Sequence, residues 1–439
     1  MKAHTQSSIW KDGAKRTSFA PLKENKSCDV LIIGGGIAGI LCAYKLKERG
    51  IDCILAEAGE ICGGITKNTT AKISVAHGLI YDKMIKRFGF DRAKDYLTAQ
   101  RLASEEYTGL CAKIDCDYEV CDSYVYSQRG RKRIDNETSA LLKLGINAEF
   151  SKAEELPFAI DGAVRIKGEA QFHPLKFLYA ISENLPIYEH TKVVELMPHK
   201  ALTTDCEITY KKLIVTTHFP ILNKHGLYSL KLYQHRSYVI ALKNAQAIRG
   251  MYVDEADTGL SFRRYEDLLL VGGGGHRTGK KGGCWQELEN FAKQYYKNAE
   301  IVARWATQDC MTLDGIPYIG QYAKSTPNVF VATGFNKWGM TNSMVAANIL
   351  SDLVSERKNP YAEVFSPFRS VFRPQLIKNI FESTVGLLTP TAPRCPHLGC
   401  ALKYNPAEHS WDCPCHGSRF TEKGELIDNP ATDDKKGNL

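Results

Sequence analysis

A glycine-rich turn between an expected strand and an expected helix constrains this chain more than any other part of its sequence. Residues 28–33 form a short apolar run typical of a buried strand, and residues 37–49 have the apolar spacing of a helix. Between them the glycines follow the pattern G-x-G-x-x-G, and a second strand is expected at 51–56. This order predicts the βαβ start of a doubly wound parallel sheet.

The same glycines are suited to holding a dinucleotide. Gly34, Gly36 and Gly39 would allow a tight turn, a close approach to a pyrophosphate and close helix–strand packing, with the diphosphate at the helix N-terminus. Glu57 follows the second expected strand, where a carboxylate can accept hydrogen bonds from ribose hydroxyls. The motif alone does not separate NAD from FAD.

The length of 439 residues allows about three domains. After the opening unit the expected elements alternate less regularly, which indicates an α/β fold with an inserted α+β domain. Further helices are expected at 91–114 and 340–355, strands at 119–127, 212–217, 233–242 and 328–333, and a hairpin at 261–275. We predict a discontinuous cofactor-binding domain (28–75, 165–222 and 305–360), a substrate domain (76–164 and 223–304), a linker (361–390) and a C-terminal module (391–439).

Composition excludes several classes of protein. Hydrophobic residues make up 44% of the chain, which excludes a disordered protein, and 57 Lys and Arg against 49 Asp and Glu give a small, dispersed positive surplus. The basic residues are not interleaved with aromatic residues, a pattern that would indicate nucleic-acid binding. No apolar segment matches a secretory signal or a membrane span. We therefore expect a cytoplasmic protein with no nucleic-acid partner and no membrane span.

Beyond the glycine turn, roughly residues 28–360 resemble the D-amino-acid-oxidase-like superfamily of FAD-dependent oxidoreductases. The matching motifs are the turn with Glu57, segments 63–66, 69–72, 191–193 and 332–341, and Trp305 with 314–320. The resemblance implies a Rossmann-like FAD domain in which Val193 meets the adenine and segment 70–72 runs beside the isoalloxazine ring. The implied cofactor-binding residues are Gly34, Gly36, Ile37, Ala38, Gly39, Glu57, Ala58, Gly64, Thr66, Thr70, Ala71, Lys72, Val193, Gly334, Gly339, Met340 and Thr341.

The resemblance leaves the catalytic residues unknown. Lys337 and Trp338 are candidates because their position would face the flavin, and the N-terminus of the following helix could stabilise negative charge on a reduced ring. Residues that could line a substrate pocket, or be purely structural, are His77, Arg263, Arg264 and His276. Amino-acid oxidases of this superfamily often carry a carboxylate-binding arginine where this chain has Asp309, which argues against amino-acid substrates. The adjacent Cys310 is expected to be a buried thiol.

Six Cys and His residues cluster near the C-terminus: Cys395, His397, Cys400, Cys413, Cys415 and His416. Two cysteines and two histidines can hold either tetrahedral zinc or a [2Fe-2S] cluster. The sequences CPHLGC and CPCHGSRF resemble the two boxes of a Rieske protein. This resemblance implies thiolates from Cys395 and Cys413 on one iron and imidazoles from His397 and His416 on the other.

Rieske proteins of the cytochrome-complex type join the two boxes by a disulfide, which here implies a Cys400–Cys415 bond; two free thiols are the alternative. Only a linker precedes the first box, so the module is expected to be trimmed to its cluster-binding hairpins and an exit strand. Such a short module is expected to lean on the flavin domain for burial.

Together the two resemblances predict a dehydrogenase. FAD would take a hydride from a small amine or hydroxy substrate, and a Rieske cluster would pass the electrons singly to an acceptor, such as a partner protein. Two alternatives stay open. One is an FAD oxidase that uses O₂ and has a structural cluster, and the other is a non-enzymatic redox sensor or electron-transfer protein.

Overall fold

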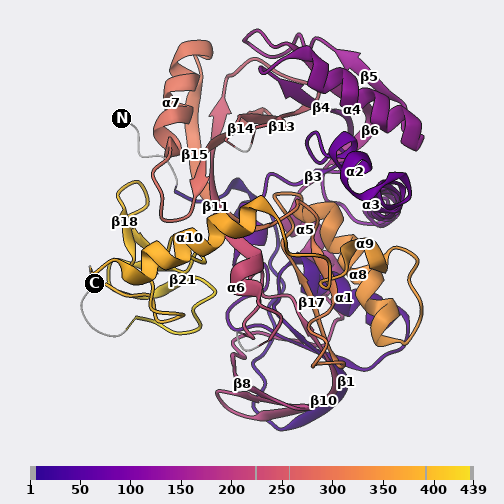
Figure 1. The fold of residues 1–439 in the computed structure, drawn as a ribbon, viewed down its shortest axis with the longest axis vertical. Coiled ribbons are helices and arrows are strands. Elements are labelled where there is room, and N and C mark those ends of the chain that lie inside the picture. Colours follow the sequence, from indigo (N-terminus) through magenta and orange to yellow (C-terminus); the bar gives the residue numbers. More distant parts are fainter. Residues whose placement is uncertain (1–5, 223–224, 257, 391–392, 436–439) are drawn as a thin grey trace.

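The computed structural model describes residues 6–222, 225–256, 258–390 and 393–435. Figure 1 shows two regions built on large sheets, one above the other, with a small C-terminal module beside their junction. Residues 391–392 and 436–439 of the predicted C-terminal module lie outside the described residues.

The first sheet, within the described residues, has eight strands in the order β16-β17-β10-β1-β2-β7, with β9 pairing β10 and β8 pairing β9. β1 pairs in parallel with β2 and β10, and β10 pairs in parallel with β17. The doubly wound start predicted from the glycine turn is thereby confirmed. The strands are β1 (Lys26–Ile33), β2 (Cys53–Ala56), β7 (Ile187–Tyr188), β8 (Val193–Met197), β9 (Lys200–Thr203), β10 (Glu207–Val215), β16 (Tyr318–Gln321) and β17 (Val329–Thr333).

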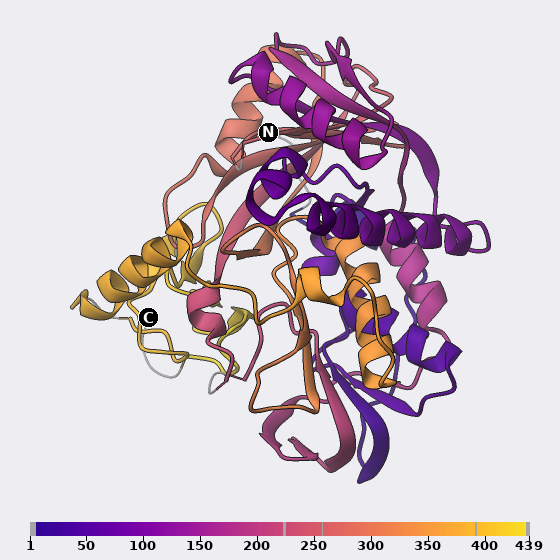
Figure 2. The same ribbon diagram turned by 45° about the vertical axis from the view of Figure 1, so that its right-hand side comes forward.

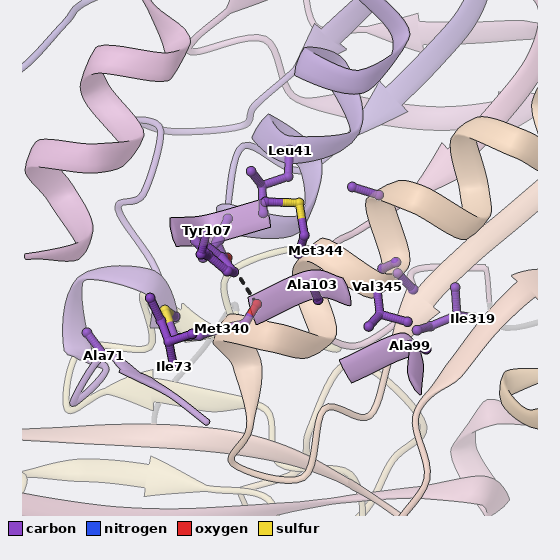
Figure 3. Close-up of a cluster of buried hydrophobic side chains, with 14 of the residues drawn as sticks. Leu41, Ala71, Ile73, Ala99, Ala103, Tyr107, Ile319, Met340, Met344 and Val345 are labelled. Atoms are coloured by element: carbon purple, nitrogen blue, oxygen red, sulfur yellow. Dashed lines mark hydrogen bonds between the residues drawn. The ribbon is translucent and has the colours of Figure 1, made fainter. Parts of the chain in front are cut away.

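Two predicted helices, α1 (Ile37–Glu48) and α8 (Gly339–Val354), pack together in the largest core cluster. The long helix α3 (Phe90–Cys111) lies across α8, with small side chains at the crossing (Figure 3). The Tyr107 hydroxyl of α3 donates a 3.0 Å hydrogen bond to the Met340 carbonyl. This contact fixes the first turn of α8.

The second sheet, again counted over the described residues, has nine strands in the order β15-β11-β14-β13-β12-β4-β6-β3, with β5 pairing β6. Its strands are β3 (Lys72–Ile73), β4 (Glu119–Ser127), β5 (Ala148–Ser151), β6 (Gly162–Gln171), β11 (Leu232–Lys243), β12 (Met251–Asp254), β13 (Ser261–Tyr265), β14 (Leu268–Arg277) and β15 (Glu300–Thr312). The remaining helices of the two regions are η1 (Ile9–Lys11), η2 (Ile65–Asn68), α2 (Tyr81–Phe88), α4 (Arg131–Leu144), α5 (Pro174–Ser182), α6 (Tyr228–Lys231) and α7 (Cys284–Tyr295). Figure 2 shows α3 passing between the second sheet and the helices of the first.

The second sheet includes strands that lie next to the predicted domain boundaries. β3 and most of β6 and β15 fall within segments predicted for the cofactor-binding domain, yet their backbone pairing is with the second sheet. The polypeptide therefore passes from one region to the other several residues away from the predicted boundaries.

The C-terminal module contains a four-stranded antiparallel sheet in the order β18-β19-β20-β21, counted over the residues the structure describes. Its strands are β18 (Lys403–Asn405), β19 (Ser410–Asp412), β20 (Arg419–Thr421) and β21 (Leu426–Asp428). The predicted linker 361–390 contains two helices, α9 (Ala362–Phe365) and α10 (Pro374–Leu388). Much of the segment predicted as a linker is therefore helical. α10 continues because Gly386 packs against the module instead of ending the helix.

Candidate functional site

The glycine turn brings β1 and α1 into very close contact. Gly34 has φ +109°, a conformation that L side chains rarely adopt. A Cβ atom at Gly39 would lie 1.9 Å from the Gly34 carbonyl oxygen. Only glycine therefore allows this turn and this packing of helix on strand.

Glu57, directly after β2, has a carboxylate fixed by two backbone groups. Its Oε2 accepts from the Gly35 N–H at 2.6 Å and its Oε1 accepts from the Gly59 N–H at 2.8 Å. Each carboxylate oxygen can accept a further hydrogen bond. From the cavity wall, Glu57 can thus still bind ribose hydroxyls.

In the first turn of α1, only some of the backbone N–H groups have hydrogen-bond partners. The Ile37 N–H donates to Thr66 Oγ1 at 3.1 Å, so this side chain takes the place of a cap, which Gly36 cannot supply. The other first-turn N–H groups, such as that of Ala38 on the cavity wall, have no partner within the helix. These N–H groups can donate hydrogen bonds to the oxygens of a diphosphate.

One cavity of about 1150 Å³ extends from this turn to the N-terminus of α8. Fourteen predicted cofactor residues line it: Gly34, Gly36, Ile37, Ala38, Glu57, Ala58, Gly64, Thr66, Thr70, Lys72, Val193, Gly334, Gly339 and Met340. Gly39, Ala71 and Thr341 are not among its lining residues. Gly39 packs beneath Gly34, Ala71 is fully buried, and the Thr341 hydroxyl lies 3.0 Å from His77 Nε2.

A turn of unusual backbone conformation leads into α8. Gly334, Asn336 and Lys337 have φ values of +72°, +51° and +72°. Non-glycine residues in this region each cost about 1 kcal/mol or more. The Asn336 side chain holds the turn by accepting from the Thr312 N–H at 2.8 Å. The result is that α8 begins at Gly339 on the cavity wall, with its positive end toward the cavity.

Lys72 is a half-buried amine on the cavity wall. Its Nζ lies 2.9 Å from Thr70 Oγ1, and burial together with the nearby Arg263 guanidinium lowers the pKa of Lys72 to about 7. Arg263 does not line the cavity, because its Nη1 donates to the carbonyls of Thr70 and Ala71 at 2.6 and 2.9 Å. Arg263 therefore holds the Lys72 segment in place, and Lys72 itself can change its protonation near neutral pH.

Asp309 brings a half-buried carboxylate to the cavity wall from β15. Burial raises the pKa of Asp309 to about 6, although the positive charges of Lys337 and Arg236 oppose the shift. Its backbone pairs with that of His235 of β11, a buried ring whose pKa burial lowers to about 2. The cavity therefore offers a carboxylate at Asp309, close enough to the catalytic candidate Lys337 for the two charges to interact. Two other carboxylates on the cavity wall already form ion pairs, Asp314 with Arg369 and Glu255 with Arg133.

The other pocket candidates have structural roles. His77 lines the cavity, but its Nδ1 lies 2.7 Å from the Tyr96 hydroxyl, its ring stacks on Trp338, and burial lowers its pKa to about 3. Arg264 forms an ion pair with Glu119, and His276 lies 3.1 Å from the Tyr238 hydroxyl. Neither lines the cavity.

Cys310 has the surroundings of an inert cysteine. It is buried, and burial raises the pKa of its thiol to about 12, so the thiol stays protonated near neutral pH.

The C-terminal module presents the predicted metal ligands from two loops with matching backbone hydrogen bonds. In one loop the Gly399 N–H donates to the Cys395 carbonyl, and in the other the Gly417 N–H donates to the Cys413 carbonyl, both at 2.9 Å. The loops are joined by the Cys400–Cys415 disulfide that the Rieske resemblance implied. The sulfur of Cys413 lies within 4.8 Å of both disulfide sulfurs.

The ligand side chains face one another in pairs. The rings of His397 and His416 have centroids 5.0 Å apart, and a hydrogen bond with Cys413 lowers the pKa of Cys395 to about 7. The Nδ1 atom of His416 is buried and has no hydrogen-bond partner among the described residues, and burial lowers the pKa of this ring to about 3. A neutral imidazole with an unused nitrogen is the form that ligates a metal. Paired thiols and paired imidazoles fit the two irons of a Rieske cluster.

One short segment of the first region separates the cavity from the cluster histidines. Thr217 and His218 line the cavity, and the ring of Phe219 lies 6.2 Å from that of His397 and 6.3 Å from that of His416. Asn429 of the module donates to the carbonyls of Thr217 and Phe219. The segment is thus held to the module at both ends.

A buried ion-pair network fixes the module on the second sheet. Glu408 pairs with Arg236 of β11 and with Arg419 of β20. Burial opposes ionisation of Glu408, but the two guanidinium groups lower its pKa to about 2. Gln308 of β15 adds a hydrogen bond of 2.9 Å to the Gly417 carbonyl. Polar groups at one end of the second sheet therefore dock the module. Other side chains at this end of the sheet face the cavity.

A family model of FAD-dependent oxidoreductases, DAO, matches residues 29–353, and a model of the Rieske [2Fe-2S] domain matches residues 378–436. The chain belongs to the DAO family of FAD-dependent oxidoreductases and carries a C-terminal Rieske domain. It is an oxidoreductase whose cofactors are FAD and a [2Fe-2S] cluster. The Rieske match begins within α10, so this helix belongs with the module.

Several relatives of this DAO-family chain match it over most of their own length. A Rieske 2Fe-2S iron-sulfur protein of Bacillus subtilis, YhfW, is 35% identical over 96% of this chain and 95% of its own length. Gamma-glutamylputrescine oxidoreductase of Escherichia coli is 22% identical over 83% of this chain and 93% of its own length. The crystal structure of glycine oxidase from Geobacillus kaustophilus has a TM-score of 0.67 at 18% identity, covering 79% of this chain and 99% of that one.

The sequence did not predict that the Rieske module forms part of the cavity wall. Leu426, Ile427, Asp428 and Asn429 of the Rieske domain line the same cavity as the glycine turn. It also missed the Arg236–Glu408 pair, whose partners lie far apart in the chain. No spacing or composition signal could have linked them, because the contact exists only after the module docks.

Proposed function

We propose that this chain is a dehydrogenase that oxidises a small amine and passes the electrons through its Rieske cluster. The observation that carries the proposal is segment 217–219, which lines the cavity at one end and packs against both cluster histidines at the other. When bound, FAD accepts two electrons as a hydride, and the cluster carries one electron at a time. A short, well-packed segment between the two sites suits stepwise electron transfer.

Asp309 supports an amine as the substrate. An ammonium group entering the cavity would find the half-buried carboxylate of Asp309, whereas a substrate carboxylate would be repelled by it. The resemblance to a gamma-glutamylputrescine oxidoreductase, whose name includes an amine, agrees with this preference. A small hydroxy substrate is the alternative within the same reaction class.

Lys72 supports a role in proton transfer. A dehydrogenated amine must lose a proton as well as a hydride, and a neutral amine at Lys72 Nζ can accept it. The hydroxyl of Thr70, 2.9 Å away, can orient that nitrogen. Lys337, in the turn before α8, lines the same cavity and would hold a positive charge near the ring and near Asp309.

The final acceptor in this proposal is a separate electron-acceptor protein in the cytoplasm. No helix in the described residues is long and apolar enough to cross a membrane.

Steady-state turnover tests the proposal. Purified enzyme with both cofactors bound is assayed with a series of small diamines, alcohols and amino acids, in air and with a one-electron dye under argon. We expect amines to be oxidised with the dye as acceptor and little peroxide to form in air. Peroxide release equal to substrate consumed would favour the oxidase, and no turnover with any substrate class would favour the redox sensor.

A further inference from the structure

Helix α10 has its apolar side chains on the outside of the molecule. Ile377, Phe381 and Leu388 are 72%, 64% and 77% exposed, and they lie on one face of the helix because their spacing is close to whole turns. Further exposed apolar residues on or beside this helix are Phe372, Ile380, Val385, Leu387 and Leu398. Figures 1 and 2 both show α10 at the surface, with the rest of the Rieske module behind it.

The inner face of α10 is polar or small, the reverse of an ordinary surface helix. Asn379 is buried, with its Oδ1 accepting from Arg277 at 2.9 Å and its Nδ2 donating to the Leu230 carbonyl at 3.1 Å. Gly386 packs against the disulfide, since a Cβ there would lie 2.5 Å from Cys415 Sγ. The orientation of α10 is therefore fixed by specific contacts, and those contacts turn its apolar face outward.

The charges beside this face are mainly basic. Lys378 is exposed on α10. Arg373, directly before the first residue of α10, is half-buried, with its guanidinium 5.5 Å from the centre of the Phe88 ring. The one acidic residue of α10, Glu382, is neutralised by Lys280 at 2.6 Å. The next residue along the chain, Lys281, is exposed.

We propose that the outer face of α10 binds the surface of a bilayer containing anionic phospholipid. A helix with a continuous apolar face and basic residues at its border is suited to lie in the headgroup region, its apolar side chains reaching the acyl chains. The positive border favours an anionic lipid surface over an apolar groove of a protein. Because α10 contacts the Cys400–Cys415 disulfide, this binding places the cluster loops directly at the membrane.

Co-sedimentation with lipid vesicles tests the proposal on the full-length enzyme with its cofactors. Vesicles of phosphatidylglycerol and phosphatidylcholine in equal parts are compared with vesicles of phosphatidylcholine alone. The double variant Ile377→Asn/Phe381→Ser removes apolar contacts, and Lys378→Glu reverses a charge. The matched controls on α4 are Leu142→Ser, at a 52% exposed leucine, and Lys143→Glu.

We expect the wild-type enzyme to bind the anionic vesicles at least tenfold more tightly than the neutral ones. The double variant and Lys378→Glu should each weaken that binding at least tenfold, while both α4 controls should bind within twofold of wild type. Flavin and cluster absorption spectra show whether each variant is folded. No binding to either vesicle, equal binding to both, or unchanged binding by the double variant would overturn the proposal. So would a dimer in light scattering that the double variant converts to a monomer, because a second copy would then cover the face.

Discussion

At the scale of single residues, Asp309 is the side chain on which the proposed substrate class depends. Replacing it in the variant Asp309→Asn keeps its size but removes the charge that would bind an ammonium group. Loss of one charge-assisted hydrogen bond costs about 2 kcal/mol, or roughly thirtyfold in kcat/KM. We expect a raised KM for amines with little change in KM for alcohols, measured by dye reduction. The exposed Asp267→Asn variant, between β13 and β14, serves as the control. Equal losses for amines and alcohols would count against an ammonium site.

Lys72 gives the reaction a predictable pH dependence. Its folded pKa of about 7 lies below the ordinary lysine value, so the amine is protonated below that pH and neutral above it. If Lys72 accepts the substrate proton, kcat should rise as the pH increases through about 7. The Lys72→Met variant should lose that rise and show a lower, pH-independent rate in anaerobic single-turnover measurements. A rise through pH 7 that survives in Lys72→Met would assign it to another group.

At the scale of elements, the segment after β10 is the connection between the two sites. The Phe219→Ala variant removes a ring that packs on both cluster histidines, and large-to-small changes in packed positions cost about 3 kcal/mol. We expect flavin reduction by substrate to stay near the wild-type rate and the later reduction of the cluster to slow. Stopped-flow absorption follows both steps. Phe365→Ala, in α9 and also fully buried, is a matched control that should leave the second step unchanged.

Docking of the Rieske module depends on the buried Glu408 between β18 and β19. Its carboxylate stabilises the folded state at any pH above the ordinary glutamate value of 4.5, and this contribution is lost as the pH falls toward about 2. Arg236 and Arg419 share two carboxylate partners, Glu408 and Asp428. The variant Glu408→Gln removes the charge of the first, which breaks two buried ion pairs and costs about 3 kcal/mol. We expect limited proteolysis to release the module faster from this variant. The exposed Glu422→Gln change in the same module should have no such effect.

The elements themselves were largely predictable because their signals are local. The βαβ start follows from glycine positions and apolar spacing within about thirty residues, and the two Cys-His boxes each span six to eight residues. α10 lies within the predicted linker. Gly386 disfavours a helix, and its presence within α10 is explained by its contact with Cys415, which the sequence does not reveal. Asp309 could be singled out because it stands in a recognisable motif, whereas Glu408 could not, since its role depends on a docked partner.

At the scale of the whole molecule, two interleaved regions share one cavity and the Rieske module closes part of its wall. Interleaving was predictable from the order of the strands, but the positions where the chain crosses between sheets depend on long-range pairing, such as that of β15 with β11. The module completes the cavity with residues 426–429 and holds segment 217–219. Substrate oxidation and electron exit are therefore expected to depend on one assembled structure.

The most direct test of this account is a single anaerobic turnover followed at both cofactors. The enzyme is mixed with one equivalent of an amine substrate, frozen at successive times and measured by absorption for the flavin and by EPR for the cluster. The account predicts that the flavin is reduced first and that the reduced Rieske signal then grows as the flavin is partly reoxidised. Full reduction of the flavin while the cluster stays oxidised would contradict it.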